Sequence, residues 1–452
     1  MKRFQKNIKL YIGFAALALA ASCKPSIDID TKGGNPENVD FSKYIAVGNS
    51  LTSGYANSGL SLKGQEQSFP NMLAQEMKKV GGGEFLQPYF PAENYNGSGF
   101  LYLKALVNGQ PQLGTVTDHL AIRGQTEDKK PLYIKYTGPI NNLGVPGMRL
   151  DMAFAPGIGT TKGNPYFERL LPDNAPATTT YVDFATTKDH TFFSFSLGNN
   201  DVLGYATNGA VTTDATNTLI SEQTFTVRYT EFITKLTSKE QKGVVATIPD
   251  VTAVPYFTTV TRQALLAGAN AALLAQNPTA TPFKDIYIKT KTAPFRAATD
   301  KDMFILPFSS AGLLGRQDLK DPATGIVNPA PYGLHPANPV GDNFVLDEAE
   351  AKMVQDRIVA LNTTIKQVAD SKKLAVADIY SFLNKVKSGY QINGIAISNK
   401  YITGNIFSLD GVHLTPMGYA IMANVFVDAI NAKYSTKLGK VNVSQYGGVA
   451  LP

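Results

Sequence analysis

The sequence predicts an α/β protein, a three-layer α/β/α sandwich in which helices cover both faces of a mostly parallel sheet of roughly five strands, with long inserted loops. Short apolar runs that suit buried strands alternate with longer segments of helical periodicity. The 452 residues are 43% hydrophobic and 17% charged, which provides enough apolar material for a sizeable core. The single cysteine excludes an intramolecular disulfide and a CxxC zinc module, so packing alone must hold the fold.

The alternation of strands and helices runs along most of the chain. The expected helices carry apolar residues three and four positions apart, and the last one starts at Thr415 and Pro416, a capping residue and a helix-starting proline. Their ranges are about 69–80, 221–239, 347–370 and 415–434. The expected strands are 44–47, 191–197, 243–249 and, counted as the fifth, 374–380. In such sheets the active site lies at the carboxyl ends of the strands.

Three stretches break the alternation, at about 81–140, 250–346 and 381–405. They contain Gly, Pro, Tyr and Phe without a sustained period, although residues 262–276 of the longest favour a helix. We expect these insertions to build walls around a site.

The N-terminal residues are typical of a secretory signal peptide. Four cations precede an apolar run from Tyr11 to Ala21, which is too short to cross a hydrocarbon core of ~30 Å comfortably. The small residues that follow end at Cys23. This segment resembles a bacterial lipobox, in which a signal peptidase cuts before the cysteine and the cysteine sulfur carries a diacylglyceryl group, although Ala20 stands where leucine is usual.

The expected organisation is therefore a lipoprotein signal peptide at 1–22, a lipidated cysteine and flexible spacer at 23–40, and a folded domain at 41–452. A plain signal peptide or a chance buried thiol is the alternative. Acyl chains on Cys23 would hold the protein on a membrane, because each buried methylene contributes ~0.8 kcal/mol. We expect an exported bacterial lipoprotein of the outer membrane, on its periplasmic or cell-surface face.

The net charge carries little information about partners. The formal charge of +6 falls to about +2 without residues 1–22, which hold four cations and no anion. No basic run with interleaved aromatic residues occurs, so no nucleic-acid partner is expected.

Polar clusters follow the strand-like runs, and a glycine-rich loop lies between two of them. Each one alone is common in tight turns. Ser50 alone could cap a helix, Asp410 could form an Asx turn, and His413 could be a buried packing histidine. The clusters are Gly48-Asn49-Ser50-Leu51-Thr52, Gly198-Asn199-Asn200-Asp201 and Asp410-Gly411-Val412-His413, with Asn142-Leu143-Gly144-Val145-Pro146-Gly147 as the loop.

Taken together and in this order, the clusters resemble the blocks of the SGNH or GDSL family of serine esterases, which supply Ser, Gly, Asn and a terminal Asp-x-x-His. The resemblance covers a framework from about Tyr44 to Tyr434, and the last block precedes the final helix as in the family. It makes 41–452 an SGNH hydrolase domain, for which we expect a flavodoxin-like sheet.

The resemblance implies a catalytic role for Ser50, His413 and Asp410. A serine hydroxyl is a weak nucleophile, so Ser50 needs His413 as the base that takes its proton. Asp410, three residues before His413, can accept from the imidazole and stabilise the cation that forms. Asp378 is a second candidate acid, but the spacing to His413 favours Asp410.

The resemblance also implies an oxyanion hole made by the backbone N–H of Ser50, the backbone N–H of Gly147 and the side-chain amide of Asn200. One such donor typically contributes ~3 kcal/mol to the transition state. Asp201 is expected to order the Asn200 loop. Asn49 stands where the family name implies aspartate, at a position without a catalytic role, so we expect activity to survive this departure.

The expected function is a serine esterase or lipase that hydrolyses carboxylic esters through an acyl-enzyme, with no cofactor and no metal. The substrate is an ester of a lipid or of an acylated glycan, so a carbohydrate O-acetylesterase is the alternative within the family. A non-catalytic surface lipoprotein that only binds a ligand is the rival from another class. The remaining histidines, at positions 119, 190 and 335, are expected to be surface or packing residues. The sequence does not indicate an oligomeric state.

Overall fold

The computed structural model describes residues 39–107, 110–321 and 324–452. Residues 1–22, Cys23 and all but the last two residues of the 23–40 spacer lie outside them. The expected signal peptide and lipidated cysteine therefore stay predictions. The described residues contain no helix that is long and apolar enough to cross a membrane.

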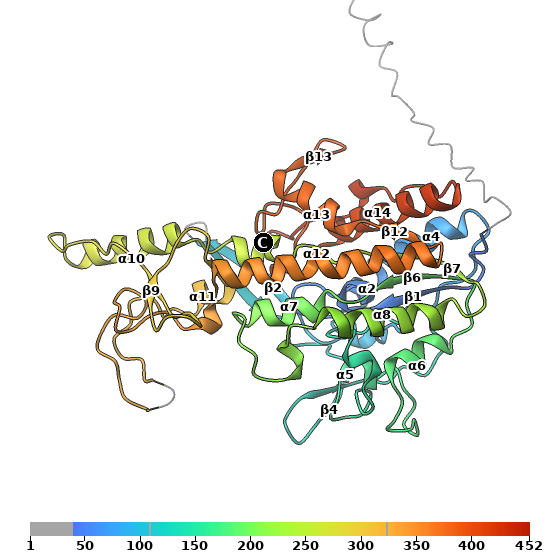
Figure 1. The fold of residues 1–452 in the computed structure, drawn as a ribbon, viewed down its shortest axis with the longest axis horizontal. Helices are drawn as coiled ribbons and strands as arrows, with labels where there is room; N and C mark the ends of the chain where they lie inside the picture. The colour runs from blue at the N-terminus through green and yellow to red at the C-terminus, as the bar shows by residue number, and fades with distance from the viewer. Residues whose placement is uncertain (1–38, 108–109, 322–323) are drawn as a thin grey trace, which may run out of the picture.

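A parallel sheet of four strands forms the centre of the domain (Figure 1). Its order is β1 (Tyr44–Gly48), β6 (Phe192–Ser196), β7 (Lys242–Ala246) and β12 (Ala375–Ala377). Most of these residues are buried, because both faces of the sheet are covered by helices.

Alternation along β6 shows which helices cover which face. Phe195 contacts Phe232 of α8 (Glu222–Leu236), with ring centroids 5.0 Å apart. Phe192, three positions earlier and so on the other face, contacts Tyr434 of α14 (Pro416–Tyr434) at 6.1 Å. The helices α12 (Glu348–Ser371) and α8 pack against each other on the first face, and α4 (Phe69–Lys78) packs on α14 on the second. The predicted three-layer arrangement is confirmed.

The sheet of the described residues has four strands where roughly five were expected, and the segment counted as the fifth forms β12. On the other side of β1 there is only a single parallel bridge, between Ala46 and Asn142. Leu143 and Val145 still donate to the carbonyl groups of Ala46 and Gly48, at 2.8 and 3.0 Å. The Asn142 side chain accepts from the N–H of Gly144 at 3.0 Å within this segment. The bridge keeps the flavodoxin-like order.

The segment after β12 also differs from the prediction, which placed a strand at 374–380 and an irregular insertion after it. β12 ends at Ala377, and α13 (Ile379–Ser388) follows. Asp378 begins this helix by accepting from the N–H of Ser381 at 3.1 Å. A capping carboxylate therefore ends the strand.

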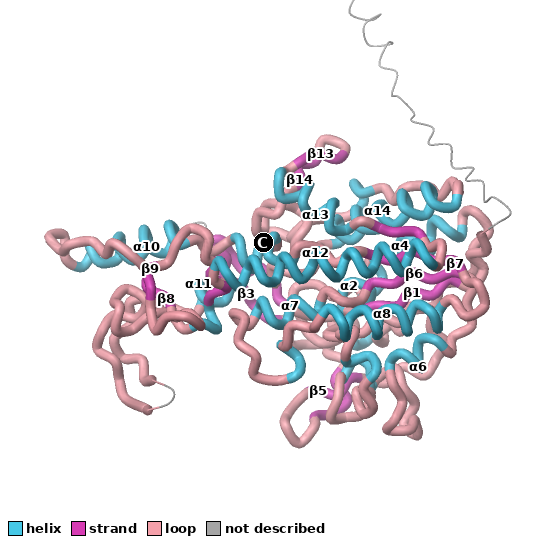
Figure 2. Tube along the Cα trace, viewed as in Figure 1, coloured by secondary structure: helices cyan, strands magenta, loops and turns pink. Residues whose placement is uncertain are grey.

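The insertions carry small two-stranded ribbons at the periphery (Figure 2). The helix α10 (Arg262–Gln276) has the predicted bounds but no buried residue, and it projects away from the sheet (Figure 1). The ribbons are β2 (Leu101–Val107) with β3 (Gln110–Thr115), β4 (Ile122–Gln125) with β5 (Pro131–Tyr133), β8 (Tyr287–Ile288) with β9 (Arg296–Ala297), β10 (Met303–Phe304) with β11 (Val345–Leu346), and β13 (Tyr390–Ile392) with β14 (Ile395–Ile397).

Short helices complete the chain between these elements. The α-helical ones are α2 (Ser50–Ser53), α3 (Leu62–Glu66), α5 (Pro165–Glu168), α6 (Tyr181–Thr186), α7 (Asn200–Thr207), α9 (Pro255–Thr258) and α11 (Leu306–Ser310). The 3-10 turns are η1 (Ala92–Asn94), η2 (Met152–Phe154), η3 (Ala215–Asn217), η4 (Val251–Ala253), η5 (Asp342–Phe344) and η6 (Val443–Gln445).

Candidate active site

Ser50 lies at the carboxyl end of β1, where the strand turns directly into α2. Asn49 caps this short helix by accepting from the N–H of Leu51 at 3.3 Å. The turn is tight: a Cβ on Gly48 would lie 2.0 Å from the Thr52 hydroxyl oxygen and 2.8 Å from the carbonyl oxygen of Ser196. Only glycine fits there, and the turn places the Ser50 side chain at the edge of the sheet.

His413 connects Ser50 with Asp410 through two hydrogen bonds. Its Nε2 lies 2.9 Å from the Ser50 Oγ, and its Nδ1 lies 3.0 Å from the Asp410 Oδ2. Asp410 and His413 stand in the loop just before α14, 360 or more residues after Ser50 in the chain. The fold therefore brings together three of the residues that the sequence singled out.

Four donors surround the Asp410 carboxylate. The Oδ1 accepts from the N–H groups of Val412 and His413, at 2.9 and 2.8 Å. The Oδ2 accepts from the N–H of Ser58 at 2.7 Å and faces the His413 imidazole. Burial alone would raise the pKa of Asp410, but the charge of His413 and these hydrogen bonds outweigh burial and hold the pKa well below its ordinary value. The carboxylate stays an ionised acceptor.

Gly147 and Asn200 lie next to each other beside this group. The segment before Gly147 runs along the end of β1, since Val145 donates to Gly48. Gly147 has a φ of 78°, and no described residue accepts a hydrogen bond from its N–H. The amide nitrogen of Asn200, the first residue of α7, donates to the carbonyl of Met148 at 3.0 Å. Two of the expected oxyanion donors thus share one corner of the site.

Asp201 holds that corner together. Its buried carboxylate accepts from the N–H groups of Leu150 and Asp151, at 2.8 and 3.1 Å. The Arg149 guanidinium binds the Asp151 carboxylate at 2.7 Å and the carbonyl of Asn200 at 3.2 Å. Burial, followed by the charge of Asp151, raises the pKa of Asp201 to about 7. Asp201 therefore anchors the Gly147 loop to α7 as well as standing in the Asn200 loop.

Sequence reasoning missed one contact and one neighbour of the site. The Asn49 side-chain amide donates to the side-chain oxygen Oδ1 of Asn199 at 2.6 Å. This bond ties the turn after β1 to the turn after β6. An aspartate at position 49 could not donate this bond. The asparagine that stands where the family name implies aspartate is therefore used in a contact of this structure. The ring of Tyr55 lies 4.7 Å from the His413 ring. No periodicity or motif marks Tyr55.

Asp378 and the three remaining histidines, which sequence reasoning placed outside the site, have other hydrogen-bond or stacking partners. Asp378 caps α13 and accepts from the Thr247 hydroxyl at 3.1 Å, with no hydrogen bond to His413. His190 is buried between the carbonyl groups of Lys188 and Leu236. His119 stacks on Tyr95 in a loop, and the Nδ1 of His335 accepts from a nearby backbone N–H. Within the described residues, no group of three or more His, Cys, Asp or Glu is arranged to hold a metal.

An apolar cavity, which we call the outer cavity, opens beside Ser50 and His413. It spans about 600 Å³ of space between atoms when the part open to solvent is counted, and the centre of a water-sized molecule can reach about 50 Å³ of it. Its walls come from the two elements that flank the sheet edge, α13 and η4, and from the loop before α14; the 81–140 insertion that we expected as a wall contributes no residue. The lining residues are Ser50, Leu51, Asn199, Leu203, Pro249, Val251, Val254, Ile379, Phe382, Leu383, Phe407, Val412, His413, Leu414 and Met422.

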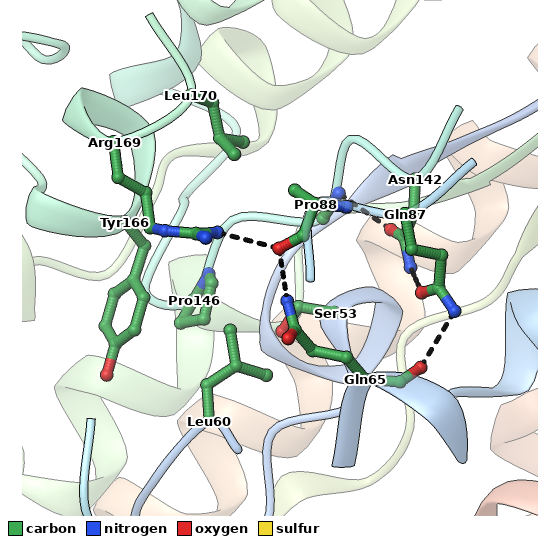
Figure 3. A pocket seen from close by; sticks show the side chains of 11 residues that line it. Ser53, Leu60, Gln65, Gln87, Pro88, Asn142, Pro146, Tyr166, Arg169 and Leu170 are labelled. Atoms are coloured by element: carbon green, nitrogen blue, oxygen red, sulfur yellow. Dashed lines mark hydrogen bonds between the residues drawn. The ribbon is translucent and has the colours of Figure 1, made fainter. Parts of the chain in front are cut away.

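A smaller cavity touches the Gly144–Pro146 segment and has a different character (Figure 3). Polar side chains converge on the carbonyl of Pro88, which accepts from Gln65 at 2.6 Å and from Arg169 at 3.1 Å. The Asn142 amide donates to Gln87 at 2.9 Å. These paired groups support the loop that carries Gly147, whereas the outer cavity offers hydrocarbon-lined space.

The chain is similar to known proteins over most of its length. A family model described as GDSL-like Lipase/Acylhydrolase matches residues 44–426. Two solved structures are similar over most of the chain. A lipase/acylhydrolase from Enterococcus faecalis is 12% identical, covers 88% of this chain and 98% of its own, and has a TM-score of 0.32. An extracellular lipase from Streptomyces rimosus is 11% identical, with 86% and 99% covered and a TM-score of 0.33. No curated protein sequence matches the chain.

Proposed function

Because the chain belongs to the GDSL-like lipase/acylhydrolase family, we propose that it is a serine esterase or lipase that hydrolyses carboxylic esters through a covalent acyl-enzyme. Ester hydrolysis is what the family and the site share. The observation that carries the serine mechanism is the hydrogen-bonded series from Ser50 through His413 to Asp410, with separations of 2.9 and 3.0 Å.

In the first step the Ser50 Oγ attacks the ester carbonyl carbon while His413 Nε2 takes the hydroxyl proton. The ionised Asp410 holds Nδ1–H toward itself, so that Nε2 is free to accept, and it stabilises the imidazolium. When the tetrahedral intermediate collapses, His413 returns the proton to the leaving alcohol. A water molecule then repeats the sequence on the acyl-enzyme and releases the acid.

The negative oxygen of the intermediate would be bound by the N–H groups of Ser50 and Gly147 and by the Asn200 amide. The unpaired N–H of Gly147 and its neighbour Asn200 support this assignment. Donors that are fixed before the reaction need no reorganisation when the charge develops. Arg149 and Asp201 would keep them in place.

The outer cavity favours an acyl group with a hydrocarbon chain over the acetyl group of a glycan. The lining of this cavity is predominantly apolar, so each methylene of a longer acyl chain that it buries contributes ~0.8 kcal/mol. Hydrolysis of p-nitrophenyl esters of increasing chain length separates the two. A sharp preference for acetate would favour the carbohydrate O-acetylesterase.

Labelling with a fluorophosphonate tests the catalytic proposal against a non-catalytic binding lipoprotein. The expected result is a covalent adduct mapped to the peptide that contains Ser50 and absent from Ser50→Ala. A correctly folded protein that stays unlabelled and inactive would favour the binding lipoprotein.

We also propose that the protein is exported and anchored to the outer membrane through lipid on Cys23. The support is the sequence of residues 1–23 alone. Mass spectrometry of the mature N-terminus is the direct test: a diacylglyceryl-modified Cys23 is expected, and a chain with an unmodified thiol would refute the anchor.

A further inference from the structure

A second, inner cavity continues the outer cavity toward the sheet. It spans about 250 Å³ of space between atoms when the part open to solvent is counted, and it has room for about one water-sized molecule without a side-chain movement. Its lining residues are Leu51, Ser196, Leu197, Asn199, Ala246, Thr247, Ile248, Pro249, Ile379 and Met422. The residues from 196 to 199 and from 246 to 249 follow or end the strands β6 and β7, so this cavity lies at their carboxyl ends. Five residues line both cavities, namely Leu51, Asn199, Pro249, Ile379 and Met422. These five form the partition between them.

Met422 is the one unbranched, flexible side chain in this partition. It lies on α14 and is 2% exposed. Asn199 is tied to Asn49, the Pro249 ring is rigid, and Leu51 and Ile379 are branched. A thioether side chain has three rotatable bonds and fills irregular gaps, so it can change rotamer without moving the backbone.

Two of the three polar side chains that line the inner cavity are hydrogen-bonded within the protein. The Thr247 hydroxyl is already engaged, since it donates to Asp378 at 3.1 Å and accepts from the N–H of Tyr380 at 3.0 Å. The side-chain oxygen Oδ1 of Asn199 accepts from the Asn49 amide at 2.6 Å. The Ser196 hydroxyl is the third polar group, and the other lining side chains of the inner cavity offer apolar surface that a methylene chain can cover.

We propose that the two cavities together receive one unbranched fatty acyl chain, and that Met422 sets the chain-length preference of the enzyme. The outer cavity holds the carbons next to the ester, the inner cavity holds the methyl end, and the Met422 side chain lies where the chain passes from one to the other. This inference rests on the proposed acyl-enzyme function of Ser50.

The test compares kcat/KM for p-nitrophenyl acetate, butyrate, octanoate, laurate and palmitate. Met422→Ala joins the cavities and is expected to move the optimum to longer esters, with a gain of about fourfold for each methylene newly buried. Ala246→Val adds two methyl groups to the inner cavity and is expected to shift the optimum to shorter esters. Met417→Ala is the matched control, because Met417 is a buried methionine of α14 that lines neither cavity.

Fluorophosphonate labelling of each variant separates the two levels of the proposal. If the wild-type protein and the variants are labelled at Ser50 but all profiles coincide, Met422 does not set chain length and the inference is wrong. If the wild-type protein is neither labelled nor active, the proposed function itself fails. If thermal melting shows that Met422→Ala does not fold, Ala246→Val decides: a shift to shorter esters supports the inference, and an unchanged profile overturns it.

Discussion

Replacement of Asp410 by asparagine should disable His413 through the wrong imidazole tautomer. The new amide has one acceptor and one donor end. At the Oδ1 position an NH₂ group would face two backbone donors, the N–H groups of Val412 and His413. At the Oδ2 position it would face one backbone donor, the N–H of Ser58, together with an imidazole nitrogen that can change tautomer. The amide therefore places NH₂ at Oδ2.

In that orientation the amide donates to Nδ1 of His413, so the proton moves to Nε2, which can then no longer accept from Ser50. This change of tautomer in a Ser-His-Asp system lowers kcat by ~10⁴-fold, or about 5 kcal/mol. The Ser58 N–H loses its acceptor, which lowers the unfolding free energy by about 0.5–1.5 kcal/mol, since Ser58 is exposed and its N–H can donate to water instead. The protein should be folded, moderately destabilised and nearly inactive.

The assay is kcat/KM for p-nitrophenyl butyrate together with urea unfolding. Asp378→Asn is the control, since asparagine caps a helix nearly as well as aspartate and Asp378 has no bond to His413. Its activity should stay within about twofold of the wild type. If Asp410→Asn retains more than a tenth of the activity while Asp378→Asn loses it, Asp378 is the catalytic acid and the assignment is wrong.

Further expectations concern the oxyanion corner, the turn after β1 and the response to pH. Asn200→Ala should lower kcat by about 10²–10³-fold with little change in KM, and an unchanged kcat would exclude the amide as a donor. Gly48→Ala should lower the melting temperature, because its Cβ would lie 2.8 Å from the Ser196 carbonyl oxygen, and an unaltered melting curve would show that the turn relaxes. Because the pKa of Asp410 is held well below its ordinary value, its carboxylate should stay ionised from neutral pH down to about pH 4, and ¹³C NMR that shows it taking up a proton in this range would contradict this. The pKa of Asp201 is raised to about 7 from an unfolded value of ~3.9, so its contribution to the unfolding free energy is largest below about pH 4 and is lost as the pH rises to about 7. Asp201→Asn should remove this decrease. If urea unfolding of the wild type and of Asp201→Asn gives the same dependence of the unfolding free energy on pH, the prediction is wrong.

Features whose signals are local were predictable from the sequence. The start of α12 is one example, because Asp347 and Glu350 cap it reciprocally within four residues. Asp410 and His413 are another, because a spacing of three residues in one loop brings carboxylate and imidazole together. The same reasoning was wrong for residues 379–388, although Ile379, Leu383 and Val386 have the spacing of one helix face and Asp378 caps the helix that they form.

The order of strands and helices, the residue types of the candidate site and their positions at strand ends follow from local patterns, since each depends on near neighbours in the chain. The surroundings of the site residues depend on how distant segments pack together. The bond from Asn49 to Asn199, the Tyr55 ring on His413 and the two joined cavities combine residues that are often more than a hundred positions apart. Such contacts leave no periodic trace in the chain, because they form only when the sheet aligns its strand ends and α13 and α14 close over them.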